Sequence, residues 1–152
     1  MSKSQNLEAI LDKARQREQE CDWIAAAKFY KSGLDVALGF NELLKASKLS
    51  EKIGFCYRRA AMQADTTGRF TEYMISVIEA YGKASSLYEK LKGKQAEACR
   101  CSAMVYYAKY WLAPTYVEKK ELLNKYHKLK AKVFELYEKA NDRLELGKAY
   151  NE

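Results

Sequence analysis

The sequence predicts an all-α protein, and three observations carry this prediction. The chain of 152 residues contains one proline and seven glycines, so few residues interrupt helices. Residues that favour helices, above all Ala, Leu, Lys and Glu, are abundant. Apolar residues recur at steps of three and four, which is the spacing of one face of a helix. A chain of this length is in the range of a single domain, so we expect one helical domain, residues 1–152, with its own core.

The first helix hairpin is expected over residues 5–39. Its first helix ends near Cys21. Asp22 then caps the second helix, which runs to about Leu38, where Gly39 supplies a left-handed residue that ends it. The apolar face of the first helix, spaced i, i+3, i+4, i+7, consists of Leu7, Ile10, Leu11 and Ala14.

The second hairpin is expected over residues 42–92. Its first helix runs to about Asp65, and residues 66–68, Thr-Thr-Gly, form the turn that follows. Its second helix covers about 70–91, and Gly93 marks the next break.

The third hairpin is expected over residues 94–141. Pro114 ends its first helix, and Thr115 caps the second helix in a Thr-x-x-Glu pattern completed by Glu118. Residues 142–152 have the pattern of a short further helical segment without a C-cap, so we expect the natural chain to continue.

Two internal similarities indicate a repeat. Residues 21–23 align with residues 68–70 at a spacing of 47, and residues 87–90 align with residues 136–139 at a spacing of 49. A unit of this length accommodates one hairpin of two long helices, and such units stack into α-solenoids.

The segment from Cys21 to Leu34 resembles the second-helix half of a tetratricopeptide repeat. The helices are longer than in the 34-residue repeat, which resembles the SNAP-like branch of that family. The resemblance implies a right-handed α-α superhelix of about three antiparallel hairpins, six long helices and a short C-terminal segment. It also implies a protein-interaction scaffold with a concave binding surface. In the first unit the family positions are taken by Asp22, Trp23, Ala26, Tyr30, Gly33 and Leu34, and in the second by Tyr57, Ala60, Ala61, Ala64 and Gly68.

Cysteine and histidine usage predicts neither a metal site nor a cofactor. Cys99 and Cys101 point about 200° apart on a helix, so they cannot easily share a metal ion. His127 is the single histidine, which leaves too few ligands for an ordinary zinc site. Free cysteines fit a reducing, cytoplasmic setting. The N-terminus lacks a secretory pattern, and the most apolar run, 101–117, is too short for membrane insertion.

Catalysis is not expected. The glycines are isolated, so no nucleotide-binding loop is present, and the sequence contains no Gly-x-Ser-x-Gly motif. His127 has no acidic residue at helical spacing on its face.

An aromatic cluster between residues 106 and 116 is the first candidate for a partner site. Tyr106-Tyr107 and Tyr110-Trp111 are adjacent pairs that cannot all face inward, so part of the cluster should be exposed. Separately, the first-helix positions that the resemblance implies to be concave, Arg15, Phe55, Arg58 and Met62, form a mixed basic and apolar surface that would suit an acidic, amphipathic peptide. The candidate residues are Arg15, Phe55, Arg58, Met62, Tyr107, Lys109, Tyr110 and Trp111.

The net charge of +7 is concentrated rather than spread along the chain. Between Lys92 and Lys132, ten basic residues face three acidic ones. Solvated lysines on an outer helix are the simplest interpretation, and a surface for an acidic protein segment, nucleic acid or anionic lipid is the other. A nucleic-acid-binding module near 119–132 is therefore the alternative function, and self-association into a homodimer through a terminal hairpin is a further one. The candidate basic patch consists of Lys120, Lys125, Lys128 and Lys132.

Overall fold

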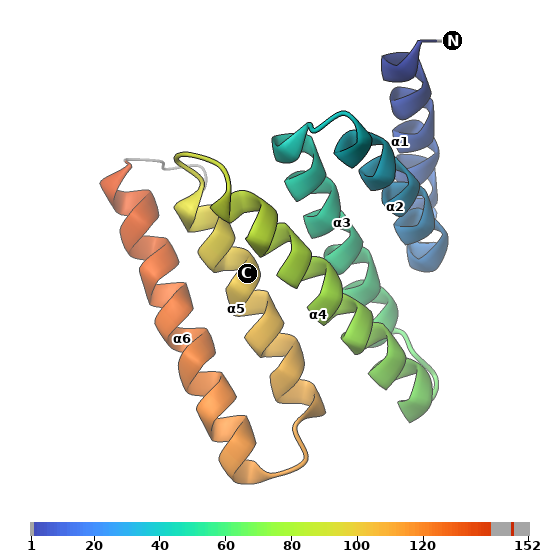
Figure 1. Ribbon diagram of the computed structural model, residues 1–152. Coiled ribbons are helices and arrows are strands. Elements are labelled where there is room, and N and C mark those ends of the chain that lie inside the picture. The colour runs from blue at the N-terminus through green and yellow to red at the C-terminus, as the bar shows by residue number, and fades with distance from the viewer. Residues whose placement is uncertain (1, 141–146, 148–152) are drawn as a thin grey trace.

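The protein is all-α, as the sequence predicts. The computed structural model describes residues 2–140 and residue 147, and within them it contains six helices and no strand (Figure 1). Most of the expected further segment at 142–152 lies outside the described residues. The helices are α1 (Lys3–Gln19), α2 (Trp23–Gly39), α3 (Leu43–Met62), α4 (Thr67–Glu89), α5 (Gln95–Leu112) and α6 (Tyr116–Lys139).

The helices stand side by side in chain order, from α1 at one edge of the molecule to α6 at the other (Figure 1). The extensive packing between helices joins each helix to the next one along the chain. This order agrees with three consecutive hairpins, whereas the right-handed superhelix and the repeat family stay predictions.

Several predicted helix boundaries are confirmed. The Asp22 side chain accepts a hydrogen bond from the backbone N–H of Ala25, and Thr115 Oγ1 accepts one from Glu118 at 3.2 Å. Gly93 is left-handed, with φ of 79°.

Two boundary predictions are wrong. Gly39 is the last residue of α2, and the left-handed residue that redirects the chain is Asn41, with φ of 56°. Asn tolerates this conformation because its short polar side chain bonds locally. Thr66 is not a turn residue after α3 but the N-cap of α4, where its hydroxyl accepts from Arg69 N at 3.1 Å, and Gly68 lies inside that helix.

Small residues let the helices approach each other closely. A Cβ atom on Gly54 of α3 would lie 2.6 Å from the Tyr81 ring of α4, so this glycine admits the ring. Ala14, Ala26, Ala37 and Ala46 are all fully buried in the core of the first three helices. A second core lies between α4 and α5.

The four cysteines are free thiols in different surroundings. Cys56 and Cys101 are buried in the two cores, Cys99 is half-buried and Cys21 is exposed. Cys56 and Cys101 therefore act as small apolar residues of the core, whereas Cys21 and Cys99 do not.

Candidate functional site

Side chains of α1, α3 and α5 reach one another on a common face of the molecule. Glu18 of α1 accepts a hydrogen bond from Lys52 Nζ of α3 at 2.7 Å, and it also accepts one from the Tyr30 hydroxyl at 2.6 Å. The Lys52 ammonium lies 5.4 Å from the ring centre of Phe55, one turn further along α3. These contacts join α1 to α3 over α2.

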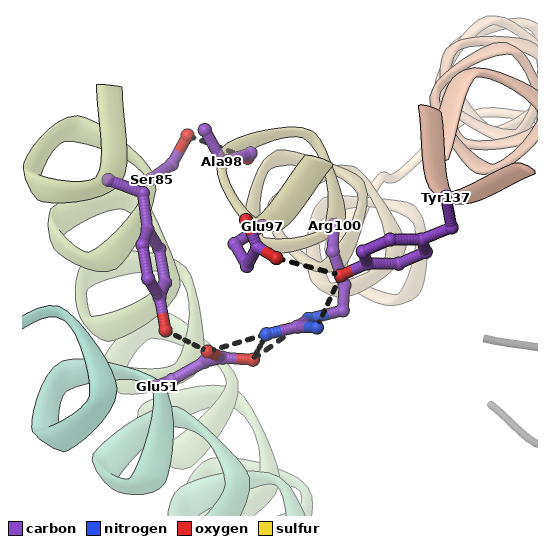
Figure 2. Close-up of polar contacts among 7 residues, drawn as sticks. Glu51, Ser85, Glu97, Ala98, Arg100 and Tyr137 are labelled. Atoms are coloured by element: carbon purple, nitrogen blue, oxygen red, sulfur yellow. Dashed lines mark hydrogen bonds and ion pairs between the residues drawn. The ribbon is translucent and has the colours of Figure 1, made fainter. Parts of the chain in front are cut away.

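A partly buried ion pair joins α3 to α5 in the same way. Arg100 donates from Nε to Glu51 Oε2 at 3.0 Å and from Nη2 to Oε1 at 2.9 Å (Figure 2). The side chains of Arg100 and Glu51 are only 13% and 23% exposed. A two-point pair of this geometry fixes both the distance and the rotation of the two helices.

Tyrosines of α4 and α6 complete this network. Tyr88 donates to Glu51 Oε1 at 2.8 Å, and Arg100 Nη1 donates to the Tyr137 hydroxyl at 2.8 Å (Figure 2). Tyr137 in turn donates to Glu97 at 3.5 Å. Arg100 thus connects α3, α5 and α6, and the bond from Tyr88 to Glu51 adds α4 to the network.

The network shifts two pKa values. Burial alone would lower the pKa of Arg100, but the adjacent Glu51 carboxylate holds it above its usual value. Burial, and then the charge of the same carboxylate, raise the pKa of Tyr88. The folded state therefore favours the charged form of Arg100 and the neutral form of Tyr88. Fixed protonation states of this kind are typical of a network that holds the structure together.

A second bridge between α3 and α5 is formed by Arg58 and Tyr107. The Arg58 guanidinium lies 5.6 Å from the ring centre of Tyr107. Its Nε is buried and lacks a hydrogen-bond partner, and no acidic residue among those described forms an ion pair with it. The positive charge is thus placed against an aromatic ring without a carboxylate to neutralise it.

Two large apolar side chains flank this bridge. Met62 and Trp111 each lie one turn beyond Arg58 and Tyr107 on their own helices, and they are 66% and 49% exposed. The Trp111 ring packs edge-on against Tyr107, with ring centres 6.3 Å apart. We call the surface of Phe55, Arg58, Met62, Tyr107 and Trp111 the α3–α5 face.

A surface pocket of about 340 Å³ lies on the same stretch of α3. Phe55 and Tyr81 provide its apolar lining, and Lys48 and Lys52 supply positive charge beside Glu51. The pocket adjoins the α3–α5 face, so an extended segment could place one apolar side chain there.

The structure brings together five of the eight predicted partner-site residues, those of the α3–α5 face. Arg15 is on α1, where its guanidinium pairs with Asp12 at 2.9 Å and Glu8 at 3.6 Å. Lys109 is not on this face, because its ammonium lies over Tyr106. Tyr110 lies between this face and α6: its ring packs edge-on against Trp111, with ring centres 5.6 Å apart, and it also contacts Lys119 of α6. The exposure predicted for part of the aromatic cluster is confirmed by Trp111 and by Tyr116, which is 77% exposed.

All four residues of the predicted basic patch are exposed on α6. The patch is not continuous, because Lys120 lies on a different side of the helix from Lys125, Lys128 and Lys132.

Sequence reasoning missed the Glu51–Arg100 pair, although a signal was present. The two residues are 49 residues apart, which is the longer of the two repeat spacings. The same offset relates Arg58 to Tyr107 and Met62 to Trp111. Applying the repeat spacing to α3 would therefore have found the two bridges described above, Glu51–Arg100 and Arg58–Tyr107.

Neither a metal site nor a membrane span is found among residues 2–140 and 147. No three His, Cys, Asp or Glu residues there are grouped to hold a metal ion, and none of the helices combines the length and the apolar character needed to cross a bilayer. The chain matches no protein-family model, and it matches neither a curated protein nor a solved structure.

Proposed function

We propose that this chain is a non-enzymatic protein-interaction module whose α3–α5 face binds an acidic, partly apolar segment of a partner protein. One observation carries the proposal: the Arg58 guanidinium, stacked on Tyr107, has no carboxylate partner among the described residues and lies beside exposed Met62 and Trp111. A carboxylate of the partner would supply the missing charge, and an apolar side chain would cover the two exposed residues.

The arrangement of helices supports a scaffold of the helical-repeat type. Each helix packs against the next along the chain, and positions 49 residues apart meet on one face. A tetratricopeptide-like superhelix would present its first helices in this way, and α1, α3 and α5 are the first helices of the three hairpins. We also propose that the module works in a reducing compartment such as the cytoplasm, in keeping with its free thiols.

The test starts from a displayed library of random peptides, because the partner is unidentified. Selection on the folded chain should enrich peptides in which Asp or Glu stands close to a large apolar residue. The best peptide is then synthesised with a fluorescent label, and its affinity is measured by polarisation. Replacing its acidic residue with the corresponding amide should weaken binding about tenfold or more, because hydrogen bonds to charged groups contribute about 1.5–3 kcal/mol.

Variants of the chain show whether the peptide uses this face. Arg58→Glu should abolish measurable binding, and Arg58→Lys should weaken it, because a lysine cannot offer a planar fork stacked on Tyr107. The matched control is Arg69→Glu, which makes the same change of charge at an exposed arginine of α4 already paired with Asp65. Selected peptides that bind Arg58→Glu as tightly as the parent chain would refute the proposal.

A further inference from the structure

A separate strip of lysines lies along the junction of α5 and α6. The ammonium groups of Lys109 and Lys125 lie 5.7 Å and 5.5 Å from the ring centre of Tyr106. Lys128 and Lys132 continue the row along the same side of α6, because each lies about one helical turn beyond the preceding lysine of the row. We call these five residues the lysine–tyrosine strip.

The strip and the α3–α5 face are on opposite sides of the α5–α6 junction. Consecutive residues of a helix point about 100° apart. Tyr107 contacts Tyr126 on one side, with ring centres 5.9 Å apart, whereas the preceding residues of both helices, Tyr106 and Lys125, meet on the other. A ligand on the strip would therefore leave Arg58 free for the proposed peptide.

The positive charge of the strip is not neutralised by the protein itself. Within the described part of the chain, none of its four lysines forms an ion pair, and α6 contains no acidic residue between Glu121 and Glu135. The ammonium groups over the half-buried Tyr106 ring belong to exposed lysines, so water screens these contacts and they are weak. They are free to move onto an anionic ligand.

A pocket of about 500 Å³ adjoins the strip at the Lys132 end. Ser102 and Cys99 of α5 and Leu129 of α6 line it together with Lys132. Glu89 is the acidic residue of its lining, at the edge formed by the end of α4. The pocket extends the strip beyond Tyr106 and offers room for a flat, partly polar group.

We propose that the lysine–tyrosine strip binds single-stranded nucleic acid, with its lysines on the phosphates and Tyr106 stacked on a base. The pattern fits this ligand because a row of cations follows a polyanion and an aromatic ring among them accepts an unpaired base. Lysine rather than arginine predicts binding without sequence preference, since base edges are read mainly by forked or amide side chains. This inference does not depend on the proposed peptide site.

The primary experiment measures the affinity of a fluorescein-labelled oligodeoxythymidine of about twelve nucleotides by polarisation, as a function of salt. If four lysines contact phosphates, the logarithm of the affinity should fall with the logarithm of salt at a slope of about −2.8. Affinity should then drop about fiftyfold between about 50 and 200 mM salt. No binding at about 50 mM salt would overturn the proposal, and so would equal or tighter binding of the matching duplex, which offers no unpaired base.

Two charge-reversal variants separate the strip from the net charge of the chain. Lys125→Glu/Lys128→Glu should weaken binding at least tenfold and reduce the salt slope by about half. Lys28→Glu/Lys31→Glu makes the same change of net charge on exposed lysines of α2 and should have a much smaller effect. Equal losses in the two variants would show that the overall charge of +7, and not the strip, attracts the oligonucleotide, which would overturn the proposal.

The stacking role is tested at Tyr106. Tyr106→Phe keeps the flat ring and should bind like the parent chain, whereas Tyr106→Leu keeps an apolar side chain without a ring and should bind about tenfold more weakly. Tyr116→Leu, which removes an exposed ring outside the strip, is the control and should leave the affinity unchanged. Unaltered binding by Tyr106→Leu would refute the stacked base. Circular dichroism on each variant confirms that the helices are retained.

Discussion

Helices α2 and α6 are held in the molecule in different ways. Seven of the 17 residues of α2 are buried, most of them alanines and large apolar side chains. Only two of the 24 residues of α6, Val133 and Tyr137, are buried. One of those two, Tyr137, is also a member of the Arg100 hydrogen-bond network.

This difference separates a densely packed region of the molecule from one whose helices are less buried. In the first three helices, small residues allow dense apolar packing. The α5–α6 hairpin has fewer buried residues, and both sides of its junction present rings and cations. The comparison predicts that α2 depends mainly on apolar packing and α6 mainly on the Arg100 hydrogen-bond network.

The largest effect is expected from Arg100→Met. This substitution leaves Glu51 largely buried without its cation and removes the donor to Tyr137, so the free energy of unfolding should fall by about 3 kcal/mol. Chemical denaturation followed by circular dichroism measures the change. The control Arg17→Met breaks an exposed pair with Glu20 and should cost less than about 0.5 kcal/mol. Equal losses in both variants would show that the network does not hold the hairpin.

A smaller effect is expected when the same substitution is made in both regions. Ala26→Leu inserts extra methylene groups at a fully buried position of α2 and should lower the free energy of unfolding by about 2 kcal/mol. Ala131→Leu, at an exposed position of α6, should change it by less than about 0.5 kcal/mol. Thermal melts of the two variants give the comparison directly, and similar losses would show that α6 is packed as tightly as α2.

The smallest effect is expected at alkaline pH, from Cys56 in the first core. Burial, followed by the charge of Glu18, raises the pKa of Cys56 from 9.0 to about 12. The neutral thiol is thus favoured in the folded state, so its stabilisation is complete below pH 9.0 and is lost as the pH rises towards about 12. Stability measured between these limits should fall less steeply in Cys56→Ala than in the parent chain. Cys21→Ala, at an exposed cysteine, should leave the slope unchanged, and the same flattening in both variants would contradict the assignment.

Local sequence signals were sufficient to predict the helices and most of their ends. Asp22 and Thr115 cap helices where the sequence places them, because an N-cap depends on the few residues around it. Gly39 was assigned wrongly because two neighbouring residues, Gly39 and Asn41, both tolerate a left-handed conformation, and packing decides between them.

For the candidate site, the sequence predicted only which residues share a face of one helix. Phe55, Arg58 and Met62 share a face of α3 by their spacing alone, and the repeat offset places Tyr107 and Trp111 opposite them. Lys109 was misplaced because the sequence does not show on which side of α5 the next helix packs. The same missing information hid the contact of Lys125 with Tyr106.

The order of the helices in space also affects the folding rate of the chain. Because each helix packs chiefly on the next one in the sequence, most contacts close short loops. Helical proteins with such local contacts fold in about microseconds to milliseconds. The Glu51–Arg100 bridge must wait until α5 has emerged, so during synthesis α1 to α3 are able to pack before it closes. The ion pair that links the second and third hairpins thus forms only after the first hairpin has been made.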